Sequence, residues 1–211
     1  MVKVKFCGIT SPKDALWAIN MGVDFIGINL VKESPRKVSL DQAKKMLGMV
    51  PPFTKTVAVA ADLPLEELLK TAKKLHFNYW QLHGNEDAAY LKTCRENGLS
   101  IIKTVKMGGE TDWQKIGDMK DYTEYFLLDT KKEDIIGGTG ESFDWNLAYL
   151  FKEKIDKPFF LAGGLTPENA AEAINSVKPW AVDVASGIEK SPRSKDFARM
   201  KDFITNARKA L

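Results

Sequence analysis

Several side chains that can take part in acid–base chemistry stand at the ends of short apolar runs in this sequence. The segment KVKFCGIT ends an alternating basic and apolar run on a cysteine, Cys7, with a glycine after it. EYFLLDT places Asp129 at the end of a second run, and WAVDVASG places Asp183 near the end of a third. Thiol and carboxyl groups can donate and remove protons, and their concentration at such positions exceeds what packing alone requires.

Glycine-rich segments follow the same kind of run. LAGGLTPEN places Gly164 just before a predicted helix, VDVASGIE places Ser186 and Gly187 after the last apolar run, and GGTG covers residues 137–140. Backbone N–H groups and helix N-termini approach a phosphate closely where glycine leaves no side chain in the way. These segments predict a phosphorylated small-molecule substrate.

Strands that alternate with helices would have to position these groups. Two of the helical patterns carry the same start signal, with Ser11 and Thr166 as expected N-caps and a proline directly after each. The helical patterns include residues 11–22, 63–75, 85–98 and 166–177. The eight runs with the composition of strands cover residues 2–7, 25–30, 55–60, 78–83, 100–105, 124–129, 158–163 and 180–185.

Eight strand–helix units predict an α/β fold, a (β/α)8 TIM barrel that forms a single domain over residues 1–211. A doubly wound open sheet more often has about five or six strands. The active site of such a barrel lies at the carboxyl ends of the strands, where the reactive groups stand. Because the outer face packs under helices and is the more apolar one, Lys5, Cys7, Asp129 and Asp183 are expected to face inward. A buried lysine needs an acid nearby, and Asp183 is the expected partner of Lys5.

The composition is that of a soluble globular protein. The net charge of +3 is spread without blocks of like charge, which argues against nucleic acid and membrane partners. The start of the chain has no cationic segment followed by an apolar one, and two cysteines cannot form a disulfide framework, so we expect a cytoplasmic protein. The sequence contains no cluster of Cys and His residues, so it does not predict a metal site. The sequence does not predict the oligomeric state.

Seven segments together resemble the phosphoribosylanthranilate isomerases of tryptophan biosynthesis. They occur in the family's order between residues 5 and 189, as KFCGIT, SPRKVS, QLHG, LLDT, GGTG followed by FDW, LAGGLTPEN and VDVASGIE. The resemblance implies an Amadori rearrangement of N-(5-phosphoribosyl)anthranilate to 1-(o-carboxyphenylamino)-1-deoxyribulose 5-phosphate, which turns an aminoaldose into an aminoketose. It implies no cofactor.

The resemblance also implies a role for each catalytic group. Asp129 would protonate the furanose ring oxygen as general acid, and Cys7 would then remove the proton from C2 as general base. A free thiol titrates near about pH 8.5 and an aspartic acid near about 3.9, so each role needs a group in its less common protonation form at neutral pH. Lys5 and a helix N-terminus after the first strand are expected to favour the Cys7 thiolate.

The remaining positions carried over from the family would bind the substrate. Arg36 of SPRKVS would pair with the anthranilate carboxylate, because a guanidinium can bind a carboxylate through two hydrogen bonds. The other positions, of which all but Asp183 would form the phosphate cradle, are Gly138, Gly164, Asp183, Ser186 and Gly187.

Each of these residues also has an ordinary structural interpretation. A cysteine at a strand end is often a small buried apolar residue, an aspartate before threonine can cap a turn, and Arg36 can be a solvated loop cation. We expect His83 of QLHG to orient a loop rather than to join the catalytic set. Cys94 is expected to pack within a helix.

Some positions depart from the family pattern, and other functions stay open. The loops that follow the second and third strands, GINLVKES and VAVAADLP, lack the family's usual aromatic residues and asparagine, and Ala185 replaces a serine.

One alternative function is that of a sugar-phosphate isomerase of histidine biosynthesis, or of an enzyme that serves both pathways. The pattern of those enzymes has a pair of aspartates at the corresponding strand ends, so Cys7 argues against this alternative. A second is a non-catalytic phospho-ligand binding barrel. A dinucleotide-binding fold is disfavoured, because no G-x-G-x-x-G follows the first strand.

Overall fold

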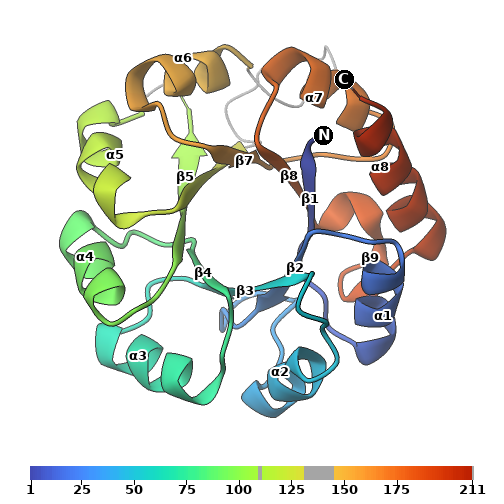
Figure 1. Cartoon of the computed structure of the whole chain (residues 1–211), viewed down its shortest axis with the longest axis horizontal. Helices are drawn as coiled ribbons and strands as arrows, with labels where there is room; N and C mark the ends of the chain where they lie inside the picture. The colour runs from blue at the N-terminus through green and yellow to red at the C-terminus, as the bar shows by residue number, and fades with distance from the viewer. Residues whose placement is uncertain (109–110, 131–144, 211) are drawn as a thin grey trace.

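The computed structural model describes residues 1–108, 111–130 and 145–210, in which eight parallel strands close into a barrel (Figure 1). Neighbouring strands follow chain order, and β1 pairs with β8 to close the ring. All eight predicted strands are confirmed, with ends that differ by at most two residues. They are β1 (Lys3–Phe6), β2 (Phe25–Asn29), β3 (Lys55–Ala60), β4 (Tyr79–Leu82), β5 (Ile101–Met107), β6 (Tyr125–Thr130), β7 (Phe159–Leu161) and β8 (Ala181–Val184).

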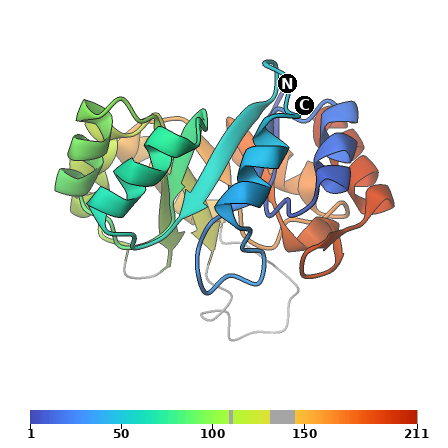
Figure 2. The ribbon, with the colours of Figure 1, turned by 90° about the horizontal axis from the view of Figure 1, so that it is seen from below.

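The helices surround the ring of strands, as the view along the barrel in Figure 1 and the side view in Figure 2 both show. They are α1 (Pro12–Asn20), α2 (Leu40–Leu47), α3 (Leu65–Lys74), α4 (Ala88–Glu96), α5 (Trp113–Met119), α6 (Trp145–Ile155), α7 (Ala170–Val177) and α8 (Phe197–Lys209). A short helical turn, η1 (Lys120–Tyr122), follows α5. None of the helices in the described ranges is both long and apolar enough to span a membrane.

A small element that the sequence pattern does not predict lies between β8 and α8. The 3-10 turn η3 (Ser186–Ile188) leads into an antiparallel pair, β9 (Glu189–Ser191) and β10 (Ser194–Lys195). Two- and three-residue strands are too short to show an alternating pattern, so only their place in the fold reveals them.

Strand residues face the barrel interior and the helices in alternation. Val4, Phe6 and Val182 belong to the large cluster that the helices cover. Lys5 is paired in register with Asp183 across the β1–β8 closure, and the two side chains share the inner face, as predicted. The apolar part of the interior is formed by Phe25, Val57, Ile102, Leu127, Phe160, Ala162 and Ala181, with the rings of Tyr79, Tyr125 and Trp180 against them. Fully burying each large side chain stabilises the fold by about 1.5–3 kcal/mol.

The two predicted helix starts have different outcomes. Ser11 caps α1 through its side chain, which accepts from the backbone N–H of Asp14, and proline follows at the first position, so that prediction is confirmed. The prediction of Thr166 as N-cap of α7 is wrong, because Asn169 holds that position. The Asn169 side chain turns back instead, accepting from the N–H of Thr166 and donating to the carbonyl of Gly164. The segment before the helix is thereby held as a turn that shapes the glycine loop after β7.

Gly187 permits a close packing between the loops after β7 and β8. A Cβ at this position would overlap the carbonyl oxygen of Leu165, which is backbone and cannot swing away. Gly117, inside α5, is the opposite case, since a Cβ there would meet no atom within 4 Å.

We therefore expect Gly187→Ala to destabilise the protein by about 1–3 kcal/mol, as overpacking does. This corresponds to a fall of about 2–12 °C in Tm for a chain of this size. Gly117→Ala is the matched control and should raise Tm slightly, because alanine is favoured over glycine in a helix by about 0.5–1 kcal/mol. Thermal unfolding followed by circular dichroism measures both. Equal effects of the two substitutions would contradict the packing described for Gly187.

Candidate active site

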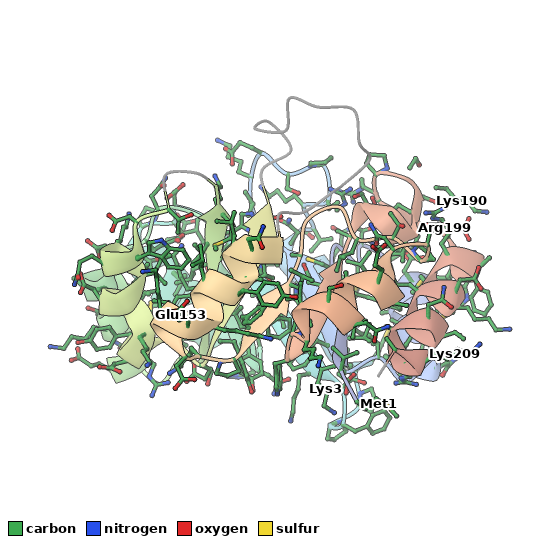
Figure 3. The ribbon with its side chains drawn as sticks, turned by 90° about the horizontal axis from the view of Figure 1, so that it is seen from above. Met1, Lys3, Glu153, Lys190, Arg199 and Lys209 are labelled. Carbon is green, nitrogen blue, oxygen red and sulfur yellow. The ribbon has the colours of Figure 1, made fainter. Side chains whose placement is uncertain are left out.

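A cavity of about 420 Å³ opens at the carboxyl ends of the strands. In Figure 3, Lys3 at the start of β1 lies at one end of the barrel, and Lys190 of β9 lies towards the other, where this cavity is found. Six of the predicted site residues line it together, from the ends of β1, β6, β7 and β8 and the loop after β2. They are Cys7, Arg36, Asp129, Gly164, Asp183 and Ser186.

A buried ion pair forms the floor of this site. Nζ of Lys5 lies 2.7 Å from Oδ1 of Asp183 and 2.8 Å from Oε1 of Gln81, and the expected Lys5–Asp183 pair is confirmed. Burial alone would lower the pKa of Lys5, but the charges of Asp183 and Cys7 outweigh burial and raise that pKa. Lys5 is therefore a buried cation held by a carboxylate and an amide oxygen.

The Cys7 thiol lies directly beside this pair. Its side chain is 8% exposed, and Gly27 of β2 leaves the space for it, since a Cβ there would lie 2.9 Å from Sγ. Burial raises the pKa of the Cys7 thiol, and although Lys5 and Lys195 lower it, Asp183 opposes them and the net shift is upward. Lys5 thus acts in the expected direction, but burial and the charge of Asp183 together outweigh the two lysines.

Asp129 ends β6 within reach of a histidine that the sequence analysis left outside the catalytic set. Nε2 of His83 lies 3.4 Å from Oδ2 of Asp129, and Nδ1 of His83 lies 3.2 Å from Nε2 of Gln81. Both His83 and Asp129 are about one-third exposed and line the cavity. The position of His83 at the end of the QLHG strand was the signal that could have placed it here.

Arg36 reaches the cavity already paired with a carboxylate. Its Nε and one terminal nitrogen donate to both oxygens of Glu189 at 2.6–3.1 Å, and this hydrogen bonding raises the pKa of Arg36. Lys195 also donates to Glu189, and despite burial the two cations lower the pKa of Glu189. Gly8 leaves room for the arginine side chain, because a Cβ at position 8 would lie 2.5 Å from Cδ of Arg36. One edge of the guanidinium is therefore occupied, and within the described part of the chain its other N–H groups have no hydrogen-bond partner.

Sequence reasoning missed Glu189 and Lys195. Glu189 lies 153 residues from Arg36 along the chain, and both new residues belong to the short strands β9 and β10. Lys195 also donates to the carbonyls of Cys7 and Ala185 and so ties the loop after β8 to the end of β1. The motif VDVASGIE includes Glu189 as its last residue, which was the available signal.

The glycine loops occupy one side of the cavity. Gly163 and Gly164 have φ values of 87° and 67°, a left-handed backbone that favours glycine, and both line the cavity with Ser186. Gly187 does not line it but packs on the backbone of the Gly164 loop. The predicted Gly138 lies outside the described residues. Within the described ranges, no group of three or more His, Cys, Asp or Glu side chains is placed to hold a metal ion.

A family model described as N-(5'phosphoribosyl)anthranilate (PRA) isomerase matches residues 4–206 of this chain. The chain belongs to the N-(5'-phosphoribosyl)anthranilate isomerase family. It is 41% identical over 204 residues to the isomerase of Petrotoga mobilis, a match that covers 97% of this chain and 96% of that protein. The resemblance stated from the motifs is confirmed.

Solved structures of this isomerase family superpose on nearly the whole chain. The crystal structure of the Thermotoga maritima phosphoribosyl anthranilate isomerase gives a TM-score of 0.87 at 37% identity, covering 99% of this chain and 100% of that one. A second crystal structure of a phosphoribosyl anthranilate isomerase holds reduced 1-(o-carboxyphenylamino)-1-deoxyribulose 5-phosphate. It gives a TM-score of 0.85 at 35% identity, with 99% and 100% covered.

The departures of this isomerase from the family pattern lie in the wall of the cavity. Val31 after β2, Ala61 after β3 and Ala185 after β8 all line it. These three side chains carry no polar group, but Asn29, Glu33 and Ser34 of the GINLVKES segment line the same cavity.

The charges around Cys7 predict how its thiol titrates. In a Cys94→Ala background, where Cys7 is the remaining thiol, the pH midpoint of alkylation by iodoacetamide should lie above about 8.5, the ordinary thiol value. Lys5→Met should move this midpoint upward, because the lysine charge lowers the pKa of Cys7, and Asp183→Asn should move it downward.

Lys3→Met is the control for the lysine substitution, since Lys3 pairs with Asp24 at the other end of β1 and should leave the midpoint unchanged. A midpoint that ignores both Lys5→Met and Asp183→Asn would show that the buried pair does not govern the thiol.

Proposed function

We propose that this protein isomerises N-(5'-phosphoribosyl)anthranilate to 1-(o-carboxyphenylamino)-1-deoxyribulose 5-phosphate in tryptophan biosynthesis. The observation that carries the proposal is a thiol and a carboxyl group, Cys7 and Asp129, at the ends of β1 and β6 in one cavity. Family membership supports it, and so does the relative that binds the reduced form of the same product. The bound compound is a phosphate ester with an aromatic carboxylate, and the cavity offers glycine loops and an arginine.

The rearrangement divides into two proton transfers. Asp129 as general acid gives its proton to the furanose ring oxygen, the C1–O bond breaks, and the nitrogen lone pair forms a C1=N Schiff base. Cys7 as general base, in its thiolate form, takes the C2 proton, and the electron pair of the C–H bond forms the enolamine. Proton transfer to C1 and loss of the proton on the C2 hydroxyl give the aminoketose.

The surroundings of Cys7 suit a base that is reformed in each turnover. Its upward-shifted pKa makes the thiolate a stronger proton acceptor once it forms, while Lys5 offsets part of the burial that opposes its charge. When Cys7 is a thiolate, the ammonium group of Lys5 lies beside its negative charge. When Cys7 is a neutral thiol, Asp183 balances the charge of Lys5.

The two ends of the substrate would be held on different loops. The N–H groups of Arg36 that Glu189 leaves free can receive the anthranilate carboxylate. The phosphate cradle would be formed by Gly138, Gly164, Ser186 and Gly187. Gly187 lets the loop after β8 pack closely on the backbone of Leu165 in the loop after β7.

Replacing either catalytic group should abolish most of the turnover. We expect Cys7→Ser and Asp129→Asn each to lower kcat by at least about a hundredfold, because a positioned acid or base contributes about 10²–10⁴ to the rate. Loss of substrate fluorescence with freshly generated phosphoribosylanthranilate measures this. Cys94→Ser, at the other cysteine, is the control and should retain activity.

Both catalytic variants should still bind the product, since neither replaces Arg36 or the glycine loops. A folded wild-type protein with no turnover of intact substrate would contradict the proposal and favour a non-catalytic phospho-ligand binding barrel.

Arg36 should act on binding more than on chemistry. Arg36→Lys is expected to raise KM by about tenfold or more with a smaller change in kcat, because lysine cannot hold Glu189 and a second carboxylate in the planar geometry of a guanidinium. Arg95→Lys, at an exposed arginine of α4 that pairs with Glu124, is the matched control. An unchanged KM in Arg36→Lys would show that Arg36 does not contact the substrate carboxylate.

A further inference from the structure

A line of side chains crosses the barrel from the ion pair to Asp129. Nζ of Lys5 is 2.8 Å from Oε1 of Gln81, and Nε2 of Gln81 is 3.2 Å from Nδ1 of His83. The other ring nitrogen of His83 lies 3.4 Å from Oδ2 of Asp129. Neither Gln81 nor this connection has a role in the two proton transfers described above.

The orientation of the Gln81 amide is fixed by its neighbours. Lysine carries three N–H donors and no acceptor, so the oxygen of the amide must face Lys5. The amide nitrogen then faces His83 and Oγ1 of Thr104, which lies 3.3 Å away. Gln81 is only 2% exposed, and a flipped amide would place N–H donors against the ammonium group of Lys5, which offers no acceptor.

The oriented amide determines where His83 carries its proton. Because the Gln81 nitrogen donates, Nδ1 of His83 must accept, and it carries no hydrogen. A neutral imidazole ring carries one proton, on one of its two nitrogens. The single proton then resides on Nε2, the nitrogen that faces Asp129.

We propose that Gln81 is a positioning residue that holds His83 as the neutral Nε2–H tautomer and thereby orients the Asp129 carboxyl group. This inference rests on the proposed function, in which Asp129 is the general acid. Nε2 of His83 lies 3.4 Å from Oδ2, so a proton on Nε2 makes Oδ2 the acceptor of the pair and leaves Oδ1 to carry the proton to the substrate ring oxygen. When that proton leaves, the carboxylate that remains keeps a donor beside it.

The tautomer can be observed directly in the wild-type protein, without any assay of activity. With ¹⁵N-labelled histidine, the two-bond nitrogen–proton correlations of the two imidazole rings, assigned with His76→Gln, distinguish the tautomers. We expect His83 to be the neutral Nε2–H form at pH 7. A neutral Nδ1–H form or a doubly protonated ring would overturn the inference.

Turnover then separates positioning from a merely structural role. Gln81→Glu presents an acceptor to Nδ1, so His83 should gain a proton there and kcat should fall about tenfold to a hundredfold, a part of what a general acid contributes, with little change in KM. His83→Gln, whose amide nitrogen can replace Nε2 as a donor, should retain more activity than His83→Leu. An unchanged kcat in Gln81→Glu with an altered tautomer, or equal losses in the two His83 variants, would overturn the inference.

These outcomes are distinguishable from failure of the proposed function. If wild-type protein does not turn over phosphoribosylanthranilate, the proposed function fails and this inference fails with it, even where the tautomer is the expected one. If wild-type protein is active, the tautomer and the His83 pair decide the inference even where Gln81→Glu does not fold.

Discussion

The ion pair between Lys5 and Asp183 is the interaction on which the rest of the site depends. It joins the first and last strands of the barrel, 178 residues apart, so closure of the ring and assembly of the site are the same event. Breaking such a buried pair by removing one partner costs about 3–5 kcal/mol, because the other charge is left without compensation. Cys7 lies beside the pair and Gln81 shares its ammonium group, so the pair also sets the charge around the thiol and the direction of the Gln81 amide.

The two ends of the cavity differ in whether side chains or backbone groups face it. At the arginine end, a glycine makes room for Arg36 and Glu189 holds its guanidinium, so the cation is positioned before any ligand arrives. At the end with the glycine loops, where we propose that the phosphate binds, left-handed glycines and the close packing of Gly187 on Leu165 bring backbone rather than side chains to the cavity. Between them, Val31, Ala61 and Ala185, which depart from the family pattern, form part of the wall, and Cys7 and Asp129 line the same cavity.

Much of this arrangement could be predicted from the sequence, for physical reasons. Strand periodicity places Lys5 and Asp183 on one face, and the cost of an unpaired buried lysine requires a partner for it. The pairing of Arg36 with Glu189 could not be predicted, because it depends on a strand of three residues that is distant along the chain. The start of α7 was missed because residues 166–169 form a turn held by the Asn169 side chain, and the helix begins after that turn. The net effect on Cys7 is a balance between burial and three charges, which no spacing of residues reveals.

The central claim is that Cys7, governed by the Lys5–Asp183 pair, is the base for the C2 proton. The most direct measurement is the pH dependence of kcat/KM for phosphoribosylanthranilate, which reports the ionisations of the free enzyme. Because turnover needs a protonated Asp129 together with a deprotonated Cys7, the share of this form falls once both groups lose their protons. The pKa of Cys7 is raised, so kcat/KM should fall at high pH with a midpoint above the ordinary thiol range and equal to the alkylation midpoint of Cys7. In Asp183→Asn both midpoints should move downward together. A high-pH limb that is absent, or that stays in place while the thiol midpoint moves, would contradict this assignment of Cys7.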